Sequence, residues 1–210
     1  MTTRALAALP ISLAVPLLLT LGACSPQASD PSPSPTPTAV GAATISKEQW
    51  LAALDPDDGA RVAALLTEPG VATVVDVRDA EGMSALLYAA QRGDAELVGA
   101  LLDAGADPTQ REMSGFPVKG AIHIAAAAGD IATLTVLLDH GLDVNTLDGA
   151  SGHALLWAAY KGQADAVTLL LAKGSDTTLV DGSGMNASER AAGEGFTEIA
   201  AQIAAAMPAE

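Results

Sequence analysis

The strongest constraint on the fold is a set of four markers that recur together along the chain. Ala-Ala pairs begin at residues 89, 125, 158 and 191, so that successive pairs are 36, 33 and 33 residues apart. A glycine, a Leu-Leu pair, and a glycine followed two residues later by an aspartate keep the same steps. These markers are Gly93, Gly129, Gly162 and Gly195, then the leucine pairs beginning at Leu101, Leu137 and Leu170, then Gly105, Gly141 and Gly174 with Asp107, Asp143 and Asp176. Because four independent markers stay in one register, we expect a chain of repeated structural units.

Each unit is predicted to contain two short helices. Residues 84–93 carry apolar side chains at helical spacing, and Gly93 ends this helix because glycine readily takes the left-handed conformation at a helix C-terminus. Asp94 then caps a second helix over residues 95–104. Gly129-Asp130 repeats this device in the next unit. The residues predicted to be buried by the second helix are Leu97, Val98, Leu101 and Leu102.

The composition indicates a core of small aliphatic side chains. Half of the residues are hydrophobic, but only 3% are aromatic. The paired alanines let neighbouring helices approach closely, and one unit by itself buries too little apolar surface to be stable. We therefore expect the units to stack into one shared core.

These features resemble the ankyrin repeat, in which about 33 residues form two antiparallel helices and a hairpin loop. Residues 73–84 and 143–145 match the family's hairpin, and the resemblance covers residues 46–207. It implies an all-α solenoid over residues 45–207 after a disordered Pro-rich tether. About three full repeats at 79–178 are then flanked by capping repeats at 46–68 and 181–207.

The sequence also departs from the family pattern. Of the family's Thr-Pro-Leu-His helix start, the histidine is kept only at His123. About three extra residues are inserted near residues 69–74, and three more lie within 111–119 at a hairpin tip. The residues before the alanine pairs are predicted to lie in the core between repeats: Tyr88, Ile124 and Trp157.

Residues 1–23 are predicted to be an export signal. A positive charge at Arg4 precedes an apolar stretch that ends in small residues. Leu21-Gly22-Ala23-Cys24 resembles the lipobox of bacterial lipoproteins, which implies cleavage before Cys24 and attachment of a diacylglycerol to its sulfur. The alternative is an uncleaved membrane helix, which two prolines within the stretch disfavour.

Residues 24–44 are predicted to be a tether. Proline alternates there with serine or threonine, and this composition favours extended chain without a core. With two or more acyl chains on Cys24, we expect stable anchoring to the extracytoplasmic face of the cell membrane. The sequence leaves open whether the envelope is Gram-positive or Gram-negative.

The charge balance excludes one class of partner. Arg4 leaves with the export signal, so the mature chain carries 25 acidic and 9 basic side chains, a net charge of −16. Such a chain repels phosphate backbones, so we expect no nucleic-acid binding. The single cysteine excludes an intramolecular disulfide, and no Cys or His cluster suits a zinc site. We expect no metal and no cofactor.

No catalytic constellation is found, and we expect the protein not to be an enzyme. His123, His140 and His153 have structural interpretations at helix starts or ends. Residues 55–59 resemble a calcium loop only superficially, because the glycine is misplaced and Leu66 stands where the closing glutamate is needed. Residues 115–120 lack the spacing of a phosphate-binding loop, and no Gly-x-Ser-x-Gly motif occurs.

The resemblance implies that a partner protein binds the concave face, which hairpin tips and inner helices form. Phe116 and Tyr160 are the predicted anchors, because aromatic side chains contribute strongly to binding. For Phe116 the alternative is that it folds its own longer loop onto the scaffold. The full set of predicted contacts is Met83, Gln91, Arg92, Met113, Phe116, Lys119, Tyr160 and Lys161.

The sequence thus predicts a monomeric, membrane-tethered, non-enzymatic protein-binding module at the bacterial cell surface or in the periplasm. One alternative is an accessory factor that protects or matures an exported enzyme, such as an oxidative-stress enzyme. Another is a hydrolase or receptor for cell-wall material, which needs an enclosed polar pocket that a shallow solenoid face seldom provides.

Overall fold

The computed structural model of the protein describes residues 44–54, 59–115 and 117–208. The described residues belong to one compact unit, and they form ten α-helices and no β-strand. The predicted export signal, Cys24 and almost all of the tether lie outside the described residues. So do Phe116 and residues 55–58 of the calcium-like sequence.

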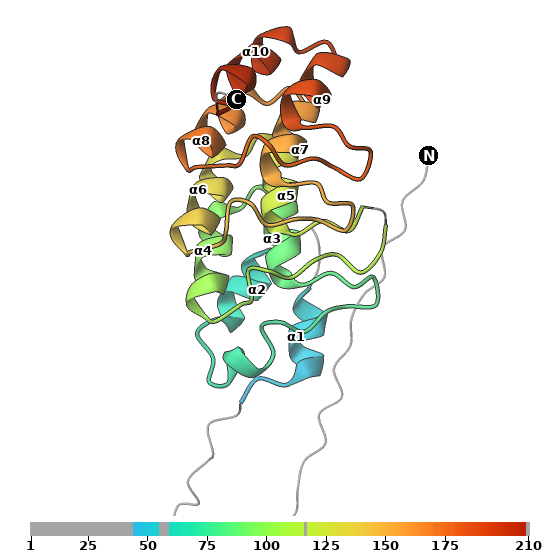
Figure 1. Ribbon diagram of the computed structural model, residues 1–210. Coiled ribbons are helices and arrows are strands. Elements are labelled where there is room, and N and C mark those ends of the chain that lie inside the picture. The colour runs from blue at the N-terminus through green and yellow to red at the C-terminus, as the bar shows by residue number, and fades with distance from the viewer. Residues whose placement is uncertain (1–43, 55–58, 116, 209–210) are drawn as a thin grey trace, which may run out of the picture. The chain divides into compact units, whose positions relative to one another are not determined.

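The helices alternate between two rows (Figure 1). The inner row comprises α1 (Lys47–Ala53), α3 (Ala85–Arg92), α5 (Ala121–Ala128), α7 (Ala154–Tyr160) and α9 (Ala187–Gly193). The outer row comprises α2 (Gly59–Leu65), α4 (Ala95–Asp103), α6 (Ile131–Asp139), α8 (Ala164–Ala172) and α10 (Thr197–Ala205). A short 3₁₀ helix, η1 (Val71–Thr73), follows α2. From α3 onward each inner helix packs on the next inner helix and each outer helix on the next outer one, which confirms the predicted solenoid of stacked helix pairs.

The helix ends follow the local chemistry of the repeated glycine and aspartate. Gly93 follows α3 and has a φ of 71°. This is a left-handed backbone conformation that residues with a Cβ atom rarely adopt. The Asp94 carboxylate then accepts the backbone N–H of Leu97 at 3.0 Å and caps α4. Asp130 does the same for α6 through the N–H of Thr133 at 3.1 Å. The predicted end of α4 was one residue too long, because the helix stops at Asp103.

The core is built from alanines where inner helices meet and from leucines between the rows. Ala89, Ala125 and Ala158 are fully buried on successive inner helices. Leu101 and Leu137 are buried from the outer row, whereas the second leucine of each pair is only partly buried. Leu102 therefore lies at the margin of the core rather than inside it. Because the alanine side chains are small, the inner helices stack closely, as expected for a core with few aromatic residues.

Four hairpins connect the units and project from the inner row (Figure 1). We call them hairpin A (residues 76–84), hairpin B (107–120), hairpin C (143–153) and hairpin D (176–186). Neighbouring hairpins are joined by hydrogen bonds: Arg78 Nη1 donates to the Arg111 carbonyl, and the N–H of Gly149 to the Val118 carbonyl. The Gly182 N–H donates to the Ala150 carbonyl in the same way. These bonds hold the tips side by side, so the hairpins form one continuous surface.

None of the helices in the described segments combines the length and the apolar character that a membrane crossing requires.

Candidate protein-binding surface

Three hairpins are tied to their inner helices by the same pair of positions. In each, an aspartate at the hairpin accepts a hydrogen bond from a side chain nine residues later in the chain. Tyr88 Oη donates to Asp79 Oδ2 at 2.6 Å, and Trp157 Nε1 donates to Asp148 Oδ2 at 2.8 Å. Arg190 forms an ion pair with Asp181. The tie fixes each hairpin tip relative to the inner helix that it precedes.

The other carboxylate oxygen of each aspartate organises the turn itself. Asp148 Oδ1 accepts the backbone N–H groups of Ala150 at 2.7 Å and Gly152 at 2.8 Å. Asp79 accepts from Glu81 and Met83 in hairpin A in the same way. Each carboxylate therefore bridges its own tight turn and the following helix.

Hairpin B is built differently. Arg111 pairs with Gly120 nine positions on, whereas Leu147 pairs with His153 and Val180 with Asn186 only six positions on. The three additional residues that the sequence predicted thus lie within this hairpin. The position of the tying aspartate is taken by Glu112, whose N–H donates to the Lys119 carbonyl at 2.9 Å. The facing position on α5 is Ile124, whose side chain has no donor, so this tie is not formed.

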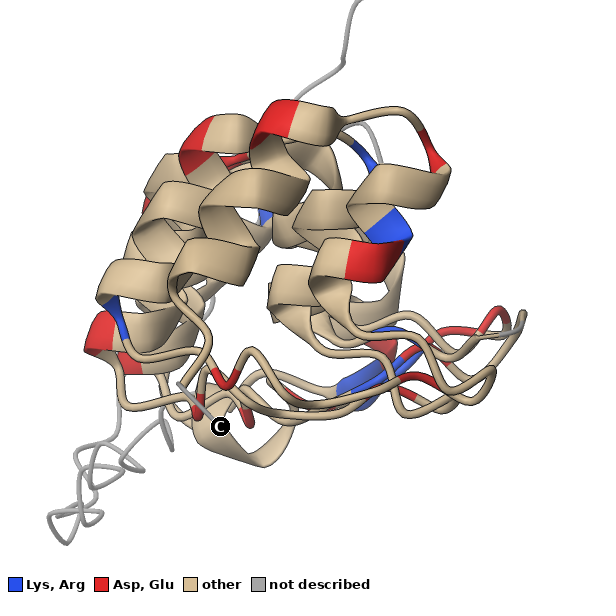
Figure 2. Cartoon of the chain, turned by 45° about the horizontal axis from the view of Figure 1, so that its top comes forward, with Lys and Arg blue, Asp and Glu red and all other residues tan. Residues whose placement is uncertain are grey.

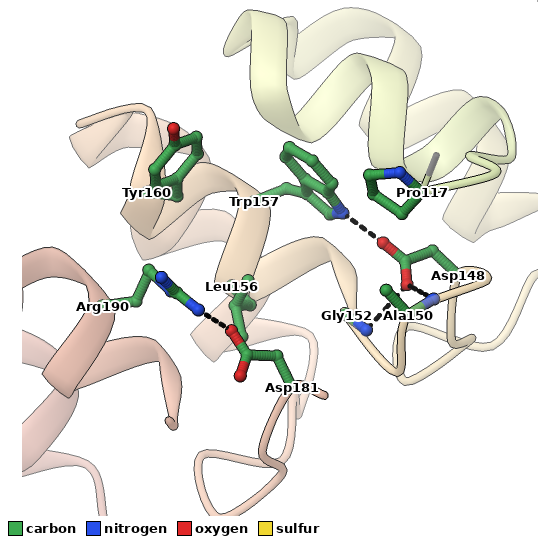
Figure 3. Close-up of a pocket in the computed structure, with 9 residues that line it drawn as sticks. All are labelled: Pro117, Asp148, Ala150, Gly152, Leu156, Trp157, Tyr160, Asp181 and Arg190. Carbon is green, nitrogen blue, oxygen red and sulfur yellow. Dashed lines mark hydrogen bonds and ion pairs between the residues drawn. The ribbon is translucent and has the colours of Figure 1, made fainter. Parts of the chain in front are cut away.

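A shallow hollow of about 250 Å³ lies where hairpins B, C and D meet α7 and α9 (Figure 3). Pro117 closes it on one side, and Arg190 with Asp181 closes it on the other (Figure 3). Leu156 and Trp157 of α7 lie between them, and Tyr160 lies one turn further along that helix (Figure 3). The hollow is open to solvent and lined largely by apolar groups, so it suits a side chain of a partner better than an enclosed small molecule.

Two lysines cover the aromatic rings beside this hollow. Lys119 Nζ lies 5.2 Å from the centre of the Trp157 ring, and Lys161 Nζ lies 4.9 Å from that of Tyr160. The two rings meet edge to face, with their centres 6.0 Å apart. These contacts fall within the range of cation–π attraction. We call Lys119, Trp157, Tyr160 and Lys161 the lysine–aromatic cluster.

The electrostatics at Asp181 favour its ionised form. Burial by itself raises the pKa of this carboxyl, but hydrogen bonds from Ser183, Arg190 and the Met185 N–H outweigh it and hold the pKa well below its usual range. The carboxylate therefore stays charged and paired with Arg190, so neither group presents an uncompensated charge to the hollow.

The structure brings together only some of the predicted contact residues. Lys119, Tyr160 and Lys161 lie in the lysine–aromatic cluster, and Phe116 lies outside the described residues. Met113 is 71% exposed at the tip of hairpin B, and Gln91 is exposed at the end of α3.

Two predicted contact residues are placed differently from what the sequence suggested. Met83 is buried, because its N–H donates to Asp79 and its side chain packs into the core; its assignment to an exposed tip was wrong. The Arg92 guanidinium is half-buried, lies 3.8 Å from Asp94, and contacts the start of α2 at Gly59. Arg92 thus belongs largely to the contact between helices rather than to the open surface.

The residues before the alanine pairs are also less buried than predicted. Tyr88, Ile124 and Trp157 are half-buried and pack on the edge of the core. Tyr88 and Trp157 keep their polar atoms at this edge because those atoms reach the hairpin aspartates. The predicted burial of these residues was therefore too high. For Tyr88 and Trp157, the hydrogen bond to the hairpin aspartate explains the half-buried position.

The three histidines lie at helix ends, as the sequence indicated. His123 is buried, accepts the Gly120 N–H at its Nδ1, and donates from Nε2 to the Thr146 carbonyl of hairpin C at 2.9 Å. His153 is also buried, but neither ring nitrogen has a hydrogen-bond partner in the structure. In the described segments, no group of three or more His, Cys, Asp or Glu residues is placed to hold a metal ion.

The sequence did not predict the role of the tying aspartates, and it placed Trp157 in the core rather than beside the hollow. Asp79, Asp148 and Asp181 recur in the same register as the four markers, each nine residues before Tyr88, Trp157 and Arg190. That spacing is visible in the sequence, but the donor differs in every unit, so no single residue type marks it. Glu112 and the longer hairpin B further interrupt the series.

Acidic residues are spread over both helix rows and the hairpins (Figure 2). Near α7, Trp157 donates to Asp148 and Arg190 pairs with Asp181, and of these two carboxylates only Asp181 has its charge compensated by a cation.

Comparison with known families gives two matches within this unit. The ankyrin repeat model matches residues 81–112, and a model of ankyrin repeats in many copies matches residues 122–171. No curated protein matches the chain significantly.

Proposed function

Because residues 81–112 and 122–171 are ankyrin repeats, which are protein-interaction modules, we propose that the chain binds another protein through its hairpins and inner helices. The contact surface in this proposal comprises the tip of hairpin B, the hollow and the lysine–aromatic cluster. We further propose that the protein acts as a non-enzymatic module.

The observation that carries the proposal is the lysine–aromatic cluster. Lys119 comes from hairpin B, whereas Trp157, Tyr160 and Lys161 come from the next unit, so stacking of two units creates the cluster. Exposed or half-buried aromatic side chains next to a hollow are typical of residues that dominate binding energy. Met113 adds an exposed, adaptable apolar side chain at the neighbouring tip.

Site-specific photocrosslinking in the native cell tests this surface. A photoreactive amino acid at Tyr160 of the full chain is expected to form a discrete protein adduct. The matched control carries the same amino acid at Ala132, which is exposed on α6 of the outer row. Equal adducts at both positions, or none at Tyr160, would contradict the proposed surface.

We also propose that the module is tethered to the extracytoplasmic face of the membrane through lipid on Cys24. The support is the lipobox-like sequence and the Pro-rich segment after it. Intact mass measurement of the chain from the membrane fraction tests this proposal. The expected product begins at Cys24 and carries the mass of acyl groups, and Cys24→Ser abolishes that product. A membrane-bound chain that still begins at Met1 would support the uncleaved helix instead.

A further inference from the structure

The lysine–aromatic cluster holds two cations without carboxylate partners in a chain with a large excess of carboxylates. Within the described segments, ion pairs form at Arg92, His140, Lys173 and Arg190, but not at Lys119 or Lys161. Glu112 is paired in register with Lys119 across hairpin B through their backbones, yet no ion pair joins their side chains. Both ammonium groups instead lie over aromatic rings.

This arrangement leaves both cations able to accept a further anionic partner. A cation over an aromatic ring keeps most of its charge available on the side away from the ring, and the contact limits the number of conformations of a flexible lysine. Lys161 is exposed, and Lys119 is half-buried beside the hollow. The two lysines thus flank one ring pair and one apolar hollow.

The negative net charge of the protein does not prevent an anionic partner from binding at the two lysines. Interactions between exposed charges are largely screened beyond about 8 Å at physiological ionic strength. The nearest aspartates that line the hollow are already engaged: Asp148 accepts three hydrogen bonds, and Asp181 is paired with Arg190. Asp148 keeps its negative charge but is only 6% exposed, so the ammonium groups of Lys119 and Lys161 are the charged groups of the cluster itself that a partner can reach.

We propose that the occupant of this site is an acidic segment of the partner protein, with carboxylates at Lys119 and Lys161 and a neighbouring apolar side chain in the hollow. This inference rests on the proposed protein-binding function and specifies the chemistry of its partner. A proline-rich segment fits the site less well, because the lysines already cover the ring faces on which proline would stack. Pro117, Leu156 and Trp157 provide the apolar contact for the neighbouring side chain.

Binding of defined peptides to the full chain in detergent tests the proposal. The probe is an end-blocked, fluorescein-labelled peptide of alternating glutamate and phenylalanine. One comparison peptide replaces glutamate by glutamine, and another has the sequence of residues 25–38 of this chain. We expect saturable binding of the glutamate peptide that weakens as salt is added, and much weaker binding of the other two peptides. Tighter binding of the glutamine or the proline-rich peptide would overturn the proposal.

Charge-neutralising variants localise the binding. Lys119→Gln and Lys161→Gln are each expected to weaken the glutamate peptide about two- to fivefold, as measured for exposed ion pairs. Lys119→Arg should keep the affinity, because it keeps the charge. Lys47→Gln on α1 removes the same charge elsewhere and should leave the affinity unchanged. Equal effects of Lys47→Gln and the cluster variants would also overturn the proposal, since they would show that net charge alone is responsible.

The double variant in cells separates this inference from the function on which it rests. With the photoreactive amino acid at Tyr160, Lys119→Gln with Lys161→Gln should reduce the adduct strongly. An undiminished adduct would overturn the acidic segment while leaving the protein-binding surface intact. If the chain that keeps Lys119 and Lys161 formed no adduct, that result would count against both the acidic segment and the protein-binding surface.

Discussion

The indole of Trp157 donates its N–H to Asp148 Oδ2 at 2.8 Å, and so joins the tip of hairpin C to the inner helix that follows it. Asp148 is only 6% exposed and accepts two backbone N–H groups with its other oxygen. One carboxylate thereby sets both the shape of a turn and the position of an aromatic ring on the binding surface.

Asp148→Asn should destabilise the protein by about 1–3 kcal/mol, because the amide group that faces the indole cannot accept its N–H once the oxygen bonds to the turn. Urea unfolding measures the change. Glu112→Gln is the matched control at the equivalent position of hairpin B, where α5 presents Ile124 and no donor. That control should cost under about 0.5 kcal/mol. Equal losses in the two variants would show that the tie contributes nothing particular.

His153 should make the protein sensitive to acid. Burial, and to a lesser degree the proximity of His123, lower the pKa of His153 from its ordinary value of 6.5 to about 4. The unfolded chain binds the proton first as pH falls, so stability is full above about pH 6.5 and decreases toward pH 4, by roughly 3 kcal/mol in all. Urea unfolding across this pH range measures the loss.

The test variant for this effect is His153→Asn. Asn186 occupies the same N-cap position before α9 and accepts the Glu189 N–H there, so asparagine suits the site. The variant should lose stability less steeply than the parent between pH 6.5 and pH 4. His140→Asn is the control: the Val136 carbonyl and Asp103 raise the pKa of His140, so its contribution is present at low pH and is lost as pH rises. An unchanged pH slope in His153→Asn would refute the assignment.

Ala125→Leu should destabilise by about 1–3 kcal/mol, because Ala125 is fully buried between inner helices and a larger side chain would force them apart. Ala128→Leu, on the same helix but exposed, is the control and should change stability by less than about 0.5 kcal/mol. Thermal or urea unfolding distinguishes the two. If both variants behaved alike, close alanine packing would not be what sets the spacing of the repeats.

Two glycines should respond to alanine in opposite directions. Gly93→Ala places a Cβ at a φ of 71° and 3.0 Å from Asp130 Oδ2, so it should cost about 1 kcal/mol or more. Gly99 lies inside α4, where a Cβ would make an ordinary contact with Val136 at 3.6 Å. Gly99→Ala should therefore stabilise by about 0.5–1 kcal/mol. Paired unfolding curves check both signs, and a gain in Gly93→Ala would contradict the C-cap assignment.

The repeat architecture was predictable because its determinants are local and recur. Gly93 and Asp94 end one helix and begin the next within two residues, and the structure confirms both roles. The alanine and leucine pairs likewise report which helix faces meet, since helical spacing converts directly into a buried stripe.

The binding surface was less predictable because it depends on contacts between units. The half-buried position of Trp157 depends on Asp148 nine residues earlier, and Lys119 meets Trp157 only because hairpin B reaches the following unit. Met83 has an apolar side chain at a hairpin, and its sequence position alone does not show that the turn folds it into the core. Such placements follow from tertiary geometry rather than from spacing.

Hairpin B is a longer loop, and α5 presents Ile124 where α3, α7 and α9 present a side-chain donor, so no aspartate tie joins this hairpin to its helix. Side-chain substitutions between Glu112 and Lys119 consequently break no aspartate tie, unlike substitutions at Asp79, Asp148 or Asp181. New recognition properties can therefore arise in this segment at little thermodynamic penalty to the scaffold. The unit that departs most from the common pattern is thus the one most open to evolutionary diversification.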